Sequence, residues 1–255
     1  MEADQSLIAD ATRAFIGSYR TLVRHVEGAA ARDVGRVFAF TTGVPISIFN
    51  CVIVDEPPTA ADVETALDWV AATSLPHLLC VPEALLPDIA PIVDRRGLRQ
   101  APWLEPHMAL SPLPDVVAAP ASGVVVRSVP GGATPAAFRE AMAASGTPLV
   151  IAERLIPDSL LEDGDVRGFV AELDGRPVGT SLAIRTGEVT GVYAVGTAES
   201  ARRRGVGAAA TRAVVEAGRS WSSRAVVLQS TEMGLHLYES LGFRTVARFA
   251  AFAPR

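Results

Sequence analysis

The fold can be predicted outward from one stretch, Gly191-Val-Tyr-Ala-Val-Gly-Thr-Ala-Glu-Ser-Ala-Arg-Arg-Arg-Gly-Val-Gly-Ala-Ala-Ala210. Its first residues favour a short strand, because β-branched residues recur there among small ones. A polar turn follows, and residues 208–217 are good helix formers. A strand, a glycine-containing loop and a helix N-terminus in this order build an anion site. The first N–H groups of a helix have no internal partner, and the helix dipole is positive at that end.

The loop residues themselves favour phosphate groups. Gly205 and Gly207 have no Cβ, so a ligand can approach the backbone closely. The three consecutive arginines, Arg202 to Arg204, add charge-assisted donors that suit phosphate oxygens. We expect the loop N–H groups between residues 203 and 208 to hold a phosphate group.

Spacing separates the protein classes that use such loops. The pattern Gly-x-x-x-x-Gly-Lys-Ser/Thr is absent, which argues against a P-loop nucleotide hydrolase. Residues 205–210 fit the loose dinucleotide pattern. However, a polar turn separates them from their strand, and the next apolar strand, 225–229, ends in Gln rather than in an acidic residue. A dinucleotide-dependent enzyme is therefore the weaker alternative.

The pattern Arg202-x-x-Gly205-x-Gly207 resembles the acyl-CoA pyrophosphate loop of the GNAT superfamily of N-acetyltransferases. The string Leu-Tyr-Glu-x-Leu-Gly-Phe at residues 237–243 is similar to the final helix and turn of that family. The resemblance covers roughly residues 123–255. It implies an α/β fold (α+β) with a mixed, mostly antiparallel sheet flanked by helices, and it implies acetyl-CoA as cosubstrate with no metal.

The resemblance also assigns expected roles to residues. Tyr238 would be the general acid that protonates the departing thiolate. Glu188, at the start of the central strand, is the nearest acidic candidate for the base, although it could equally be a solvated hairpin residue. Thr231 stands near the position where the family often carries Asn. The expected cofactor-binding set is Val195, Gly196, Thr197, Arg202, Arg203, Arg204, Gly205, Val206, Gly207, Ala208 and Thr231.

The predicted function is transfer of an acetyl group from acetyl-CoA to a primary amine, by direct attack in a ternary complex. The acceptor is open and could be a small molecule or a peptide. A second alternative is a non-catalytic acyl-CoA-binding sensor or scaffold, which would keep the loop and not need Tyr238.

The chain of 255 residues is long enough for two domains. We predict an N-terminal α/β domain at 1–115, a linker rich in Pro, Ala and Ser at 116–122, and a GNAT-like domain at 123–255. A strand at 48–54, a helix and a strand at 78–81 follow one another in the same order as elements of the second half, but the arginine–glycine loop is missing. The N-terminal half is therefore a candidate degenerate copy of the same fold; the other possibility is an unrelated α/β domain.

Composition restricts the remaining possibilities. A net charge of −5 gives no reason to expect nucleic acid as a partner. The first residues are polar and acidic, and no apolar run reaches membrane-spanning length, so we expect a cytoplasmic protein without membrane contact. Cys51 and Cys80 lie in apolar runs and are expected to be buried thiols. The apolar content is compatible with a homodimer.

Overall fold

The structure is a computed structural model that describes residues 2–115 and 123–254, so the predicted linker lies outside the described residues. The N-terminal half contains α1 (Glu2–His25), β1 (Ala30–Val34), β2 (Val37–Thr41), η1 (Ser47–Phe49), β3 (Asn50–Val54), α2 (Ala60–Ala71), β4 (Leu78–Pro82), η2 (Glu83–Leu85), α3 (Leu86–Arg96), β5 (Arg99–Gln100) and β6 (Glu105–Leu110). The C-terminal half contains β7 (Val124–Val129), α4 (Pro135–Ala144), α5 (Leu149–Leu155), α6 (Asp158–Leu161), β8 (Val166–Leu173), β9 (Arg176–Thr186), β10 (Val189–Thr197), η3 (Glu199–Ala201), α7 (Val206–Ser220), β11 (Ala225–Gln229), η4 (Glu232–Gly234), α8 (Leu235–Ser240) and β12 (Arg244–Ala253).

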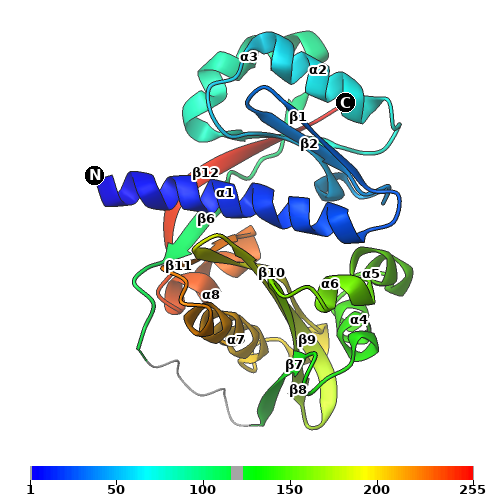
Figure 1. Ribbon diagram of the computed structural model, residues 1–255, viewed down its shortest axis with the longest axis vertical. Helices are drawn as coiled ribbons and strands as arrows, with labels where there is room; N and C mark the ends of the chain where they lie inside the picture. Colours follow the sequence, from blue (N-terminus) through cyan, green and yellow to red (C-terminus); the bar gives the residue numbers. More distant parts are fainter. Residues whose placement is uncertain (1, 116–122, 255) are drawn as a thin grey trace.

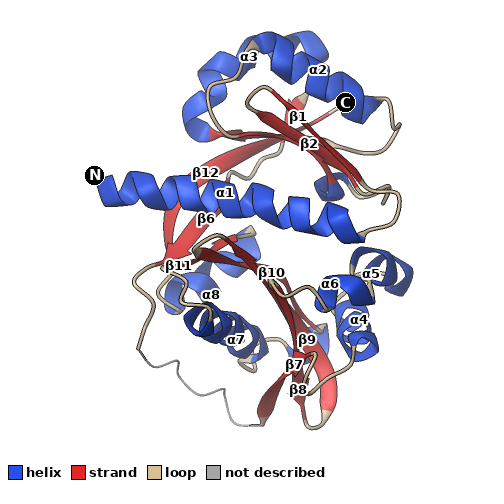
Figure 2. Cartoon of the chain, viewed as in Figure 1, coloured by secondary structure: helices blue, strands red, loops and turns tan. Residues whose placement is uncertain are grey.

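One continuous sheet joins both halves, in the strand order β1-β2-β3-β4-β12-β6-β11-β10-β9-β8-β7, with β5 beside β12. Within the described residues the parallel pairs are β3 with β4 and β10 with β11, and the remaining pairs are antiparallel. Helices flank the sheet (Figures 1 and 2). The predicted fold class, a mostly antiparallel sheet flanked by helices, is confirmed.

The two halves repeat one connectivity. In the first, β2 and β3 form an antiparallel pair and α2 leads to the parallel strand β4. In the second, β9 and β10 form an antiparallel pair and α7 leads to the parallel strand β11. This agreement supports the prediction that the N-terminal half is a copy of the same fold.

The halves exchange their last strands. Strand β6 of the first half pairs with β11 of the second, with Met108 opposite Leu228. Strand β12 of the second half pairs with β4 of the first, with Ala250 opposite Val81. Figure 1 shows β12 and β6 crossing from one half to the other. The sheet therefore runs across the predicted division at 115 and 123, and the boundary itself stays a prediction.

Helix α1 lies between the two halves (Figure 1). It contacts β9, β10 and β11 on one side and β2, β6 and β12 on the other. A salt bridge of 2.6 Å joins Arg224 to Asp10, and the Tyr193 hydroxyl donates to the Ala14 carbonyl at 2.9 Å. Arg20 donates to Asp33 of β1 at 3.0 Å. The helix thus ties both halves together around the exchanged strands.

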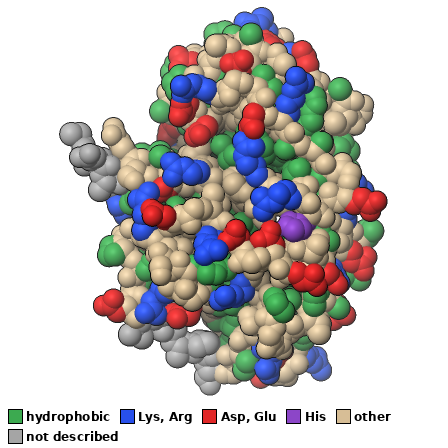
Figure 3. Space-filling model, in the orientation of Figure 1, with side chains coloured by type: hydrophobic (Ala, Val, Ile, Leu, Met, Phe, Trp, Pro, Cys, Tyr) green, Lys and Arg blue, Asp and Glu red, His purple; other side chains and the backbone are tan. Residues whose placement is uncertain are grey.

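The two cysteines are free, buried thiols in the core that α1 forms with β3 and β4, as predicted. The strand predicted at 48–54 begins only at Asn50, because residues 47–49 form the short 3-10 helix η1. On the face shown in Figure 3, acidic and basic side chains are interspersed rather than gathered by sign.

Candidate functional site

Strands β10 and β11 separate partway along their length. Their pairing ends at Val192, opposite Leu228. Beyond that point β10 continues only against β9, where Gly196 lies opposite Thr180. A β-bulge between Tyr193 and Gly196, with Ala194 at φ 48°, marks the divergence. The β11-facing edge at residues 195–197 therefore lacks a neighbouring strand and can accept an extended ligand as one.

The open edge leads to the N-terminus of α7. Gly205 precedes this 15-residue helix with φ 80° and ψ 5°, and no side chain caps it. The first N–H groups therefore remain available to an external acceptor. Arg203 also has a positive φ, 59°. Such alternating backbone turns point successive N–H groups toward an anion.

A groove of about 870 Å³ follows the open edge and the helix N-terminus. Ten members of the cofactor-binding set predicted from sequence line it: Val195, Gly196, Thr197, Arg202, Arg203, Gly205, Val206, Gly207, Ala208 and Thr231. The eleventh, Arg204, does not line the groove and instead forms an ion pair of 3.4 Å with Asp174. Within the described residues, Arg202 and Arg203 form no ion pair, so their charges remain available to a polyanion.

Tyr238 lies at the inner end of this groove, on α8. It is 8% exposed, and its ring meets the edge of Phe243 at 6.0 Å. Burial raises the pKa of Tyr238 to about 12. The buried phenol is a weaker acid than a free tyrosine, and it stays protonated at neutral pH, which a proton donor requires.

The Thr231 hydroxyl can still donate a hydrogen bond into the groove. Its hydroxyl oxygen accepts from the Gly234 N–H at 3.2 Å, so its own O–H can still donate to a ligand. The neighbouring Ser230 is fully buried and donates to the Thr231 carbonyl at 2.8 Å. Of these two residues, Thr231 is the one that lines the groove.

The placement of Glu188 contradicts its predicted role as base. It precedes β10, whereas the groove begins at Val195, about 20 Å farther along the strand at the usual rise per residue. Its side chain is 83% exposed and lies 3.6 Å from Arg224. Glu188 is the solvated hairpin residue that the sequence left as the alternative.

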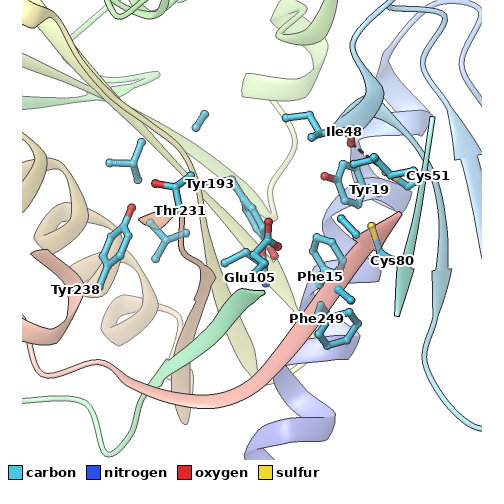
Figure 4. Close-up of a pocket in the computed structure, with 17 residues that line it drawn as sticks. Phe15, Tyr19, Ile48, Cys51, Cys80, Glu105, Tyr193, Thr231, Tyr238 and Phe249 are labelled. Atoms are coloured by element: carbon cyan, nitrogen blue, oxygen red, sulfur yellow. Dashed lines mark hydrogen bonds between the residues drawn. The ribbon is translucent and has the colours of Figure 1, made fainter. Parts of the chain in front are cut away.

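A carboxylate that the sequence argument missed lies on the inner side of Tyr238. Glu105, the first residue of β6, lines a chamber of about 370 Å³ together with Tyr238, Thr231 and Val195. Figure 4 shows Glu105 at the end of its strand, with Tyr238 and Thr231 on one side and Phe15 and Tyr19 on the other. The exchange of β6 brings it there. The sequence signal was only an acidic residue directly before a short apolar strand.

A second inner chamber, of about 460 Å³, continues from the first. The two chambers share Phe15, Tyr19, Ile48, Tyr193, Ala194 and Gln229. Helix α1, η1 and the end of α4 contribute to its wall, which contains no charged side chain among the described residues. Groove and chambers meet around Tyr238, so two ligands can reach one reaction point from opposite sides.

No group of three or more His, Cys, Asp or Glu side chains among the described residues is arranged to hold a metal ion. No helix among those residues has the length and apolar character needed to cross a bilayer.

Comparisons with known proteins agree with this geometry. Residues 137–243 match the family model described as the acetyltransferase (GNAT) family. No curated protein matches the chain.

Solved structures resemble nearly the whole chain. A GCN5-related N-acetyltransferase from Kribbella flavida is 22% identical with a TM-score of 0.70, over 96% of this chain and 95% of that one. A GCN5-related N-acetyltransferase from Sphaerobacter thermophilus is 17% identical with a TM-score of 0.64, over 89% and 82%. A tandem GNAT protein from the clavulanic acid biosynthesis pathway is 15% identical with a TM-score of 0.59, over 89% and 83%.

At these identities the structural matches establish the fold, and the tandem protein has the architecture found here in both halves. The family match covers the segment that carries the open strand edge, the α7 N-terminus and Tyr238. Residues 137–243 of this chain are therefore similar to the GNAT acetyltransferase family in sequence, and nearly the whole chain is similar in fold to solved GCN5-related N-acetyltransferases.

Proposed function

We propose that the protein transfers an acetyl group from acetyl-CoA to a primary amine of a small-molecule or peptide acceptor. One observation carries this proposal: the strand edge that opens after Val192 leads directly into the uncapped N-terminus of α7. An extended arm followed by a pyrophosphate fits that sequence of donors. The mixed surface charge in Figure 3 favours such an acceptor over a nucleic acid.

The residues of the groove suit acetyl-CoA in volume and in chemistry. Backbone groups at residues 195–197 can pair with the amides of the pantetheine arm. The first N–H groups of α7, with Arg202 and Arg203, can hold the phosphates. When bound, the cosubstrate supplies an acetyl group activated as a thioester.

Two groups of the chain and the shape of the site can promote the reaction. An N–H of the opened β10 edge can stabilise the oxyanion that develops when the amine attacks the carbonyl. The Tyr238 hydroxyl can donate its proton to the thiolate as the C–S bond breaks. The junction of groove and inner chambers holds both substrates at once, which is the requirement of a direct attack in a ternary complex.

Two alternatives lead to different measurements. A non-catalytic acyl-CoA sensor would bind the same ligand and be indifferent to Tyr238→Phe. A dinucleotide-dependent enzyme is disfavoured, because β8, β9 and β10 are antiparallel where a dinucleotide fold requires parallel strands.

The test is calorimetric titration of the whole chain with acetyl-CoA. We expect one site per chain, with a Kd weakened about tenfold or more by Arg202→Glu together with Arg203→Glu. Arg219→Glu is the matched control, because Arg219 lies in the last turn of the same helix and pairs with Glu216. Absence of acetyl-CoA binding by the wild-type chain would refute the proposal. Equal loss in the control would remove the assignment of the groove.

A further inference from the structure

The space on the inner side of Tyr238 is built by both halves of the chain. Its wall includes Phe15 and Tyr19 from α1, Cys51 and Cys80 from β3 and β4, and Tyr193 from β10. Figure 4 shows these side chains arranged around one cavity. Because the cavity meets the groove at Tyr238, an acceptor can reach the reaction point from this side.

Glu105 is the one charged side chain among the described residues that line the two inner chambers. Its ion-pair contact is with the ring of His107, whose Nε2 lies 3.7 Å from the carboxylate. That ring is fully buried and burial lowers its pKa, so it is neutral at pH 7. The Glu105 side chain, which is 42% exposed, therefore presents its carboxylate to the cavity without a cationic partner in this ion-pair contact.

The position of Glu105 is fixed by the centre of the sheet. Its backbone lies opposite Phe249 of β12, and two residues later His107 lies opposite Gln229 of β11. The His107 ring stacks on Phe249 with centroids 4.0 Å apart. Strands on both sides hold this segment, so the carboxylate is presented from a rigid element rather than from a loop.

A second polar group faces the same place. The Gln229 side chain lines both inner chambers, and its Nε2 atom is buried without a hydrogen-bond partner among the described residues. Buried amide groups without partners are rare in folded proteins, because desolvation is not repaid. This amide therefore marks the wall as a surface that a ligand completes.

Beyond these two groups the second chamber is mostly apolar. Leu22, Ile46, Phe49, Met142, Leu182 and Ile184 contribute to it, and its other polar side chains are the hydroxyls of Ser18, Tyr19, Thr147 and Tyr193. The Ser18 and Tyr193 hydroxyls already donate to backbone carbonyls of α1. A polyamine or a sugar would therefore find few partners there to replace the hydration it loses. A hydrocarbon chain would instead gain by leaving water.

We propose that the acceptor is a primary amine on an apolar body, with its amino group at Glu105 and its hydrocarbon part in the second chamber. This inference rests on the proposed acetyl transfer and names its substrate class. The exchanged strand β6 of the N-terminal half would thereby supply the acceptor-binding carboxylate of the C-terminal site.

The proton balance follows from this arrangement. The ammonium group gives one proton to the Glu105 carboxylate, which passes it to solvent. The neutral amine attacks the acetyl carbonyl; the C–N bond forms and the C–S bond breaks. The departing thiolate takes the Tyr238 proton, and the second proton lost by nitrogen restores the phenol. The net products are the N-acetylated amine, free CoA and one proton.

The test measures binding of n-butylamine, n-hexylamine and n-octylamine to the whole chain by calorimetry, without acetyl-CoA. Each added methylene should lower Kd about fourfold until the second chamber is filled. Glu105→Gln should raise Kd about tenfold or more, because it removes the charged partner and nearly preserves the shape. Glu188→Gln is the matched control and should leave Kd unchanged, since that carboxylate lies outside both chambers. Spermidine and ethanolamine should bind more weakly than n-hexylamine.

The outcomes separate this inference from the proposed function. Chain-length-dependent binding that Glu105→Gln weakens supports the inference. If acetyl-CoA binds but the alkylamines do not, or if the polar amines bind better, the inference is overturned and acetyl transfer stands. If the alkylamines bind as expected but acetyl-CoA does not, the acceptor chamber is supported and the proposed function is overturned. Equal effects of Glu105→Gln and Glu188→Gln would remove the assignment of Glu105.

Discussion

Replacing Tyr238 by Phe should remove a proton donor without disturbing the fold. The Tyr238 hydroxyl makes no hydrogen bond within the described residues, and its ring packs by an edge contact that Phe can keep. We therefore expect the free energy of unfolding to change by no more than about 0.5 kcal/mol. The KM for acetyl-CoA should also change little, because the groove is lined mainly by other residues.

The expected loss in kcat can be scaled from the pKa. Raising the phenol pKa from 10.0 to about 12 disfavours the phenolate by about 3 kcal/mol relative to water. Because the Tyr238 phenolate is so unfavourable, the phenol must receive a new proton at the same time as it protonates the departing thiolate. Its contribution should then lie at the lower end of general acid catalysis, about 10²-fold in kcat.

The assay is continuous detection of released CoA thiol with n-hexylamine and acetyl-CoA, from pH 6 to pH 10. Wild-type kcat should show no alkaline decline from Tyr238 in this range, because the phenol titrates near 12. Glu188→Gln serves as an active control with an unaltered groove. A Tyr238→Phe protein with wild-type kcat, or one that has lost acetyl-CoA binding while still folded, would refute the acid role.

Three further predictions concern stability and the shape of the groove. Arg224→Ala should lower the free energy of unfolding by about 3 kcal/mol, against about 1 kcal/mol for Asp10→Ala. Asp10 is 1% exposed and Arg224 is 44% exposed, so water can replace the partner of the arginine but not that of the buried carboxylate. Equal costs of the two substitutions in urea melts would contradict this asymmetry. Burial lowers the His107 pKa, so below about pH 6.5 the unfolded chain binds a proton that the folded chain excludes, and stability should fall from pH 6.5 to pH 5 by at most about 1.4 kcal/mol per pH unit. His107→Phe should flatten that part of the curve, and an unchanged slope would exclude His107 as its cause. Gly196→Ala would place a Cβ 2.8 Å from the Ser145 Cβ, so this variant should bind acetyl-CoA more weakly. The double variant with Ser145→Gly should regain the affinity. If it does not, the contact with Ser145 is not the cause of the loss.

The groove that we propose for acetyl-CoA was largely predictable because its parts lie close together in the sequence. Residues 195–208 form one strand end, one turn and one helix N-terminus, and local propensities specify each of them. The exception was Arg204. An arginine run predicts charge density but not which side chain turns toward Asp174, on a hairpin distant in the sequence.

The acceptor side was not predictable, and Glu188 shows why. Its proximity to the central strand in sequence suggested access to the site, but a strand extends about 3.3 Å per residue and carries its two ends far apart. Glu105 stands more than ninety residues before the groove loop and enters the site only because β6 pairs with β11. Nothing in the short segment Glu-Pro-His-Met-Ala-Leu indicates that it pairs with β11 of the C-terminal half rather than with a strand of the N-terminal half.

The repeat of strand, helix and strand, the glycine loop predicted to bind an anion and the tyrosine that follows it could be predicted from the sequence, since each depends on residues a few positions apart. The exchange of β6 and β12, the place of α1 between the halves and the position of Glu105 across the inner cavity from Tyr238 follow from tertiary packing. Backbone hydrogen bonds between strands are nearly the same for any apolar segment. The choice of partner is therefore made by the burial of all the side chains together, and a local pattern does not contain it.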